Sequence, residues 1–183
     1  MNLKITFNGT GTSQGVPVIS CTCLVCNSKD PRDRRLRTSI LIEDHQTSVC
    51  IDAGPDFRQQ MLKVHQKRLD AIVLTHEHKD HLAGLDDVRA FNYTMGQSMP
   101  VFAHQRVIEA LRREFSYVFE NPNYPGLPQF ELMPINNRPF KIGSLDLLPI
   151  PVLHADLPVM GFCINDLYTS QMPIAYRNQP GRS

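Results

Sequence analysis

The sequence predicts a single α/β sheet sandwich, and three patterns support this prediction. Residues 38–44 and 47–54 are β-branched runs separated by His45 and Gln46, which is typical of a β-hairpin. Residues 69–76 form a short apolar run of the kind found in buried strands, and segments with helical spacing lie between the strand-like runs. Strands mixed with intervening helices favour an α/β sandwich over a helical bundle.

The remaining elements follow from the same two periodicities. Apolar residues at helical spacing predict three helices, at residues 57–65, 85–95 and 105–119. Alternating or continuous apolar runs predict four further strands, at residues 3–7, 130–135, 140–143 and 145–154. A proline-rich loop at residues 121–129 separates the last helix from the later strands.

Composition narrows the class of protein. A chain of 183 residues with 42% hydrophobic and 20% charged residues fits a globular domain rather than a disordered segment. The formal charge of +1 disfavours nucleic acid as a partner without excluding it, because a local basic patch stays open. No apolar run reaches the roughly 18 residues that span a bilayer, and the first one is too short for a signal peptide. We therefore expect a cytoplasmic protein with no membrane partner, and a homodimer stays open.

Four metal-ligating side chains crowd into residues 76–81, directly after the apolar run. His76, His78 and His81 offer imidazoles, and Asp80 offers a carboxylate. A strand end, a tight loop and the first turn of a helix can direct all four inward. Neutral imidazole suits zinc, iron or manganese, and a carboxylate shifts the preference toward harder ions. The alternative, a solvated polar loop with some core histidines, is disfavoured by the density of ligand types.

The segment THEHKDHLAGL resembles the His-x-His-x-Asp-His signature of the metallo-β-lactamase superfamily. The resemblance implies the αβ/βα sandwich of that family and a catalytic site for two divalent metal ions, zinc or manganese. It implies that His76 and His78 bind the first metal. Asp80 and His81 would bind the second, and Asp80 would also help to orient the nucleophile. His154 lies at a later strand end, where the family places a further ligand.

Other residues are judged against the same family. Asp52, in IDAGPD, resembles the strand-end aspartate that orients the metal ligands from behind. His45, His65 and His104 lack comparable settings. We expect these three to be ordinary surface or loop histidines.

The five cysteines argue against a disulfide framework, because their number is odd and no export signal precedes them. Cys21, Cys23 and Cys26 fall close together, and residues 8–42 around them look like the PhnP-type subgroup of the superfamily. That resemblance implies one structural zinc on these three thiolates, apart from the catalytic metals. A closed tetrahedral site needs a fourth ligand, and no residue obviously matches it. Three cysteines in a loop without metal is the alternative.

The rest of this segment is rich in glycine and arginine. Gly9, Gly11 and Gly15 miss the dinucleotide-binding spacing by one residue, so we expect a tight passage from strand to loop near the active site. Four arginines follow, which could meet a substrate phosphate or form a solvated charged loop; they are Arg32, Arg34, Arg35 and Arg37.

The PhnP-type resemblance implies a metal-dependent hydrolase. The expected activity is that of a phosphodiesterase, in which a metal-bound hydroxide attacks a small cyclic phosphodiester. Two alternatives stay within the superfamily, a nuclease of the tRNA-processing type and a thioester hydrolase. A third is a truncated, catalytically silent metal-binding protein.

Hydrophobic patterning breaks off after residue 166, where the family calls for a strand that ends in Thr-Asp-Ala. Codons for residues 169–178 can spell Ile-Thr-Asp-Ala in a shifted frame. We therefore expect residues 1–166 to be the N-terminal part of one metallo-β-lactamase-like domain, truncated in its C-terminal half. Residues 167–183 would be an aberrant, frameshifted tail without the bridging aspartate, and hydrolysis would be weak.

Overall fold

The computed structural model describes residues 2–120, 124–165 and 167–169. Its strands form two sheets. The first has the order β1-β2-β3-β4-β5-β6, with bounds Lys4–Gly9, Ser39–Glu43, Ser48–Ile51, Ala71–Val73, Met99–His104 and Phe130–Ile135. The second has the order β10-β9-β8-β7, with bounds Leu167–Thr169, Leu157–Ile164, Leu145–His154 and Phe140–Ile142.

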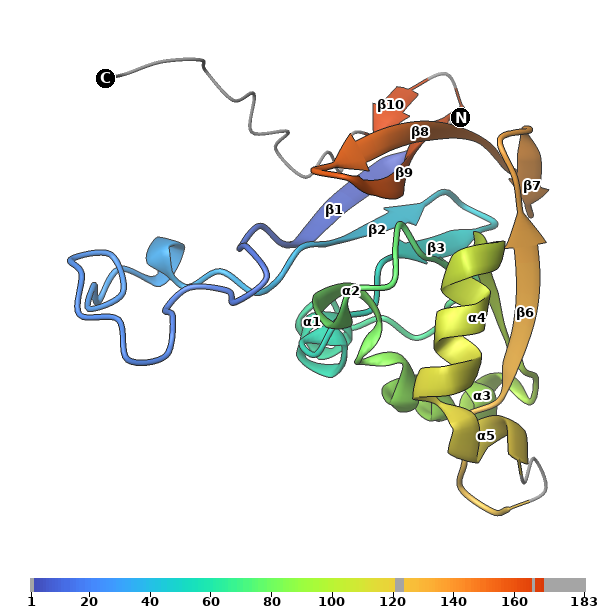
Figure 1. The fold of residues 1–183 in the computed structure, drawn as a ribbon, viewed down its shortest axis with the longest axis horizontal. Coiled ribbons are helices and arrows are strands. Elements are labelled where there is room, and N and C mark those ends of the chain that lie inside the picture. Colours follow the sequence, from blue (N-terminus) through green and yellow to red (C-terminus); the bar gives the residue numbers. More distant parts are fainter. Residues whose placement is uncertain (1, 121–123, 166, 170–183) are drawn as a thin grey trace.

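Helices cover one face of the six-stranded sheet, and the four-stranded sheet covers the other (Figure 1). The α-helices are α1 to α5, with bounds Phe57–Lys63, Lys79–Leu82, Arg89–Met95, Gln105–Glu114 and Ser116–Glu120. Two 3₁₀ turns, η1 and η2, have bounds Pro31–Asp33 and Leu85–Val88. One hydrophobic core lies between the helices and the first sheet, and a second lies between the two sheets. The alternating side chains of the central strands supply both cores.

Strand direction decides where polar side chains gather. β1, β2 and β3 pair antiparallel, whereas β3, β4, β5 and β6 pair parallel. Parallel neighbours need crossover connections, and the helices α1 to α5 occupy those connections. The carboxyl ends of β3, β4 and β5 therefore lie at one edge of the sheet, which is where open α/β sheets commonly bind ligands.

The structure confirms an α/β sandwich and corrects several element predictions. The strands β5 and β9 were not predicted, and the helix expected at residues 85–95 is divided into η2 and α3. The helix expected at residues 105–119 is likewise divided, between α4 and α5. The aberrant tail expected at residues 167–183 lies outside the described residues except for β10, whose backbone pairs with β9. That expectation stays a prediction.

The connection between β1 and β2 is a long arm, residues 10–38, which projects away from the two sheets (Figure 1). Its two halves are held together at the base by backbone hydrogen bonds, from Gly11 to Leu36 and in both directions between Val16 and Arg35. A Cβ on Gly9 would lie 1.9 Å from the carbonyl oxygen of Arg37. The tight strand-to-loop passage therefore needs glycine because the two halves cross there without space for a side chain.

A helix that crosses a bilayer must be long and apolar. Among the described residues, none of the helices meets the length and apolarity that a membrane span requires.

Candidate metal centre

The strand ends of the first sheet deliver the predicted ligands to one place. Asp52 follows β3, and His76 follows β4 after Leu74 and Thr75. The chain then turns into α2, with His78 immediately before its first residue. Asp52 and His76 are almost completely buried, at 0% and 2% exposure, whereas His78 is exposed. The site therefore has a buried base and a more open rim.

The Asp52 carboxylate connects two segments of this site. Its Oδ1 accepts a hydrogen bond from the backbone N–H of Thr75 at 2.9 Å. Its Oδ2 accepts one from the Thr75 hydroxyl at 2.9 Å and one from Nδ1 of His81 at 2.7 Å. The backbone of Asp52 has φ of 62°, a strained conformation for a non-glycine residue that clusters at functional sites. These hydrogen bonds hold the strained residue in place.

The same network determines which nitrogen of His76 carries a proton. The Thr75 hydroxyl donates its single hydrogen to Asp52. It also lies 2.8 Å from Nδ1 of His76, so it can only accept there, and Nδ1 must be the protonated nitrogen. Burial and the nearby charge of His81 lower the pKa of His76 to about 4. His76 is therefore neutral at pH 7, with a free lone pair on Nε2, as a metal ligand requires.

That lone pair faces a second imidazole. Nε2 of His76 lies 3.1 Å from Nδ1 of His78. The ring of His154, which comes from the end of β8, has its centroid 6.1 Å from that of His76 and 5.9 Å from that of His78. The structure therefore brings these three predicted ligands together from two sheets.

A second pair of donor atoms lies beside the first. Nε2 of His81 lies 3.2 Å from Oδ2 of Asp80, and the rings of His76 and His81 are 4.0 Å apart. Although burial opposes it, the carboxylates of Asp52 and Asp80 raise the pKa of His81. A nitrogen and a carboxylate oxygen this close are stable with a proton or a cation between them.

These atoms suit divalent metals. Imidazole nitrogens with one carboxylate oxygen are common ligands of zinc and manganese, and buried hydrogen-bonded groups that orient the ligands are typical of metal sites. The donor atoms form two close pairs, His76 with His78 and Asp80 with His81. No three of these residues have ligand atoms that all lie within 4.8 Å of one another. Among the described residues, the cysteine sulfurs are the one group of three ligand atoms that all lie within 4.8 Å of one another. The role of each residue as a ligand stays a prediction.

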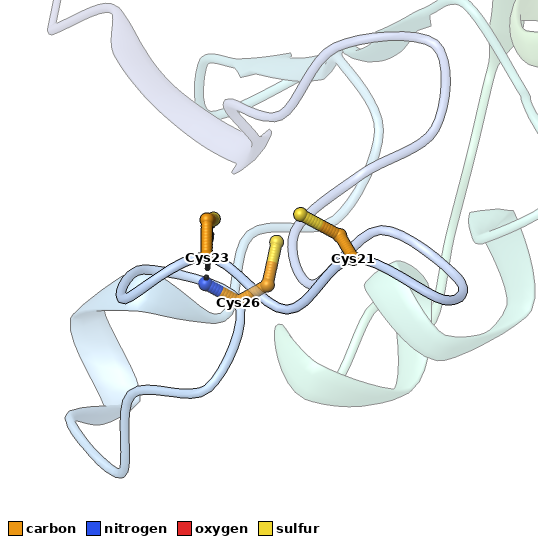
Figure 2. Close-up of side chains that lie close together, drawn as sticks. All are labelled: Cys21, Cys23 and Cys26. Atoms are coloured by element: carbon orange, nitrogen blue, oxygen red, sulfur yellow. Dashed lines mark hydrogen bonds between the residues drawn. The ribbon is translucent and has the colours of Figure 1, made fainter.

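The cysteine triplet lies on the projecting arm, far from α2 in Figure 1. The three sulfurs of Cys21, Cys23 and Cys26 point to the same side of the loop (Figure 2). The backbone N–H of Cys26, with the neighbouring thiols, lowers the pKa of Cys23 to about 7, which favours the thiolate that binds metal. Val18 donates its N–H to the sulfur of Cys26 at 3.3 Å. Two backbone N–H groups, those of Val18 and Cys26, therefore donate to cysteine sulfurs of this loop.

The remaining predicted groups are three histidines and the arginines of the arm. His45, His65 and His104 are exposed, and His104 accepts a hydrogen bond at the start of α4, where it lines a small cavity together with Thr75. Arg37 pairs with Asp56, and Arg32 pairs with Asp30. These two arginines therefore already have carboxylate partners within the arm and at its base.

Two residues of the site were missed by the sequence analysis. Thr75 stands directly before His76, so its position beside the motif was a usable signal. Arg106 carries no local signal, because its partners Glu77 and Pro158 lie 29 and 52 positions away.

Comparisons with known proteins agree with this geometry. A family model described as the beta-lactamase superfamily domain matches residues 47–176. The crystal structure of a diphosphatase from the PhnP family is 37% identical with a TM-score of 0.82, over 90% of this chain and 62% of that one. Zn²⁺-bound PqqB from Methylobacterium extorquens is 20% identical with a TM-score of 0.67, over 87% of this chain and 58% of that one.

A curated relative is similar over the same region. A protein of Porphyromonas gingivalis named octanoyltransferase is 42% identical over 161 residues, which are 87% of this chain and 32% of that protein. The chain thus spans between about a third and two thirds of the length of these relatives. The family model and the fold of the PhnP-family structure confirm the resemblance that the motifs carried. The chain belongs to the beta-lactamase superfamily, as a PhnP-like protein with a metallo-β-lactamase fold.

Proposed function

We propose that the histidine–aspartate cluster holds divalent metal ions and that the chain contributes this site to a hydrolase of phosphate esters. The observation that carries the proposal is that two pairs of donor atoms lie close together, one pair on each side of a buried hydrogen-bond network. His76 faces His78, Asp80 faces His81, and the Asp52 carboxylate reaches both pairs through hydrogen bonds.

The protein's own groups prepare the site for metal. Asp52 accepts the Nδ1 proton of His81, and the Thr75 hydroxyl accepts that of His76, so Nε2 is the nitrogen that each imidazole can offer to a metal, facing Asp80 and His78 respectively. His78 is exposed and Asp80 is half-buried, so a small substrate can reach the rim. Divalent metals bound there would supply Lewis-acid activation of water and neutralise charge on phosphoryl oxygens.

The proposed substrate is a small cyclic phosphodiester. The similarity to a PhnP-family diphosphatase supports phosphate chemistry at this site. The near-neutral chain favours a small phosphodiester over a long nucleic acid, which usually needs a broad basic surface. We propose zinc or manganese at the histidines and one structural zinc at the cysteines. The Zn²⁺ in the PqqB structure supports zinc in this fold.

A second candidate is hydrolysis of an acyl thioester. The observation that favours it is the 42% identity to a segment of an octanoyltransferase, a protein whose name refers to an acyl group. The matched segment is 32% of that protein, so the name describes a much longer chain. Phosphate ester hydrolysis remains the first proposal, because the PhnP-family structure matches nearly the whole chain in space.

The experiment is a substrate panel on the metal-loaded full chain: bis(p-nitrophenyl) phosphate, a ribose cyclic phosphodiester and an octanoyl thioester. His78→Ala removes an exposed candidate ligand, and His45→Ala is the matched control, because His45 is exposed in the turn between β2 and β3. Phosphodiester turnover that is lost in His78→Ala and kept in His45→Ala supports the first proposal. Turnover of the thioester alone supports the second. A chain that binds metal and turns over none of the three is a silent metal-binding protein, which contradicts both.

A further inference from the structure

Among the described residues, most of the segment that carries His154 pairs with one other strand of its sheet. β8 and β9 pair from Leu147 with Ile164 to His154 with Leu157. Within the described residues, β7 pairs only with residues 145–147 of β8, and β10 pairs only with residues 162–164 of β9. In the part of the chain that the structure describes, the rest of the hairpin, residues 148–161, forms a two-stranded ribbon, and such ribbons are marginally stable by themselves.

Two contacts attach this ribbon to the ligand loop. The backbone N–H of Met160 donates to the carbonyl oxygen of Thr75 at 3.0 Å. The second contact is the guanidinium of Arg106, at the start of α4, whose Nη2 lies 3.0 Å from Oε2 of Glu77 and 2.6 Å from the carbonyl oxygen of Pro158. Glu77 stands between His76 and His78. One nitrogen therefore joins the ligand loop to the ribbon.

Packing supports the ribbon at Met160, which belongs to the core between the two sheets, but much less near His154, where Leu153 is 63% exposed. A cavity of about 110 Å³ lies between the ribbon and the start of α4, and its lining includes Thr75, His104, Arg106, Val107, Pro158 and Met160. Because side chains do not fill this space, the hydrogen bonds across it contribute to how close the ribbon lies to the loop. The register of β8 and β9 then transmits that position to His154, since its neighbour Leu153 pairs with Pro158.

We infer that Arg106 is a positioning residue for the metal site. It ties Glu77 to the ribbon and thereby holds His154 against His76 and His78. This inference rests on the proposed function, because it takes His154 as a ligand. A guanidinium suits the task because its N–H groups are fixed in one plane and remain charged at any pH at which the protein is folded.

The test uses the full chain with Arg106→Met, which keeps the apolar stem and removes the donors. Arg106→Lys keeps the charge, and Arg113→Met is the control, since Arg113 is exposed on the same helix. We expect Arg106→Met to weaken Co²⁺ or Zn²⁺ binding at the histidines by about 10-fold to 100-fold, as loss of an orienting contact does in other metal sites. Arg106→Lys should recover part of this loss, and Arg113→Met should match the unaltered protein.

Two further readouts separate positioning from general damage. Sulfur-to-cobalt charge-transfer absorption reports the cysteine triplet alone, and it should be unchanged in Arg106→Met. Hydrogen exchange of the metal-free chain should show faster exchange at the ribbon amides and unchanged exchange in β2 and β3. Glu77→Gln should cost little more in the Arg106→Met background, because the two residues share one contact.

The outcomes distinguish this inference from the proposed function. If the unaltered histidine cluster binds no metal, the proposed function is wrong, while the exchange measurement still tests whether Arg106 fixes the ribbon. If the unaltered protein binds metal and Arg106→Met binds it equally, with unchanged ribbon exchange, the positioning role is overturned.

Discussion

Individual residues of the candidate site are linked by hydrogen bonds that fix which atoms carry the protons. Asp52 is fully buried and strained, and a backbone strain of this kind costs on the order of 1–3 kcal/mol. The hydrogen bonds from Thr75 and His81 offset that cost and set the protonation of both rings. Thr75 is the link to His76, because its hydroxyl both donates to Asp52 and accepts from Nδ1.

This network predicts that Thr75→Val weakens metal binding at the histidines. Valine keeps the shape but removes the hydroxyl, so Nδ1 of His76 loses its acceptor and the lone pair is no longer confined to Nε2. We expect about 10-fold to 100-fold weaker Zn²⁺ binding in competition with a chromophoric chelator. Thr75→Ser keeps the hydroxyl and should bind within a few-fold of the unaltered protein. Equal affinity for the valine and serine variants would show that the hydroxyl does not orient His76.

Among the elements, the loop after β3 and the α2 region are in direct backbone contact, without side chains between them. The N–H of Ala53 donates to the carbonyl oxygen of His81, and the N–H of Gly84 donates to that of Ala53. A Cβ on Gly54 would lie 1.9 Å from the carbonyl oxygen of Asp80. The glycine thus allows the loop after β3 to touch α2, which brings Asp52 within reach of His81.

Gly54→Ala should therefore disturb both stability and the site. Displacing α2 is expected to cost about 1–3 kcal/mol of unfolding free energy, as overpacking does, and to weaken metal binding. Gly161→Ala is the matched control, because the nearest atom to its Cβ would be at an ordinary 3.7 Å. Urea unfolding of the metal-free proteins measures the difference. A Gly54→Ala protein as stable as Gly161→Ala would contradict the close contact.

The two sheets are also joined by a polar contact at their turns. Oγ1 of Thr47 lies 2.8 Å from Oγ of Ser144 and accepts the N–H of that residue, and Ser144 donates to Asp44. The Ser144 hydroxyl and the backbone N–H of Gln46 lower the pKa of Asp44 below its usual value. A lowered pKa in the folded state means that this contribution to stability is present above the ordinary carboxyl pKa and is lost as pH falls through the lowered one.

The substitution Thr47→Val tests this contact between the two sheets. Thr47 is buried, so removal of its hydroxyl leaves the backbone N–H of Ser144 without its acceptor and should cost about 1–3 kcal/mol. Thr94→Val is the control, since that hydroxyl is exposed and bonds only within its own helix. Thermal unfolding at neutral pH measures both. A loss no larger than that of Thr94→Val would mean that the contact does not stabilise the pair of sheets.

For the molecule as a whole, the sequence predicted which side chains gather where those side chains are near one another in the chain. His76, His78, Asp80 and His81 lie within six positions, and so do the three cysteines, so one loop suffices to gather each group. Their roles as metal ligands stay predictions. His154 was placed only through the family resemblance, since no local pattern links it to a loop 73 positions earlier. β5 escaped prediction although Met99, Val101 and Ala103 alternate inward, because Pro100 argues against a central strand. Arg106 could not be found at all, since its contacts exist only after folding.

The arm and the sandwich form separate parts of the molecule, each with its own set of candidate ligands. Cys23→Ser should therefore lower stability through the arm while leaving metal binding at the histidines unchanged. Because of this separation, metal bound at the histidine–aspartate cluster can be measured in a chain without the cysteines.

The measurement is the metal content of the full chain in which Cys21, Cys23 and Cys26 are all replaced by serine, after zinc loading and desalting. Elemental analysis should find at least one zinc per chain, and the further replacement of His76 and His78 by alanine should abolish it. A cysteine-free chain that retains no zinc, while the unaltered protein retains it, would contradict the account and assign metal binding to the arm alone.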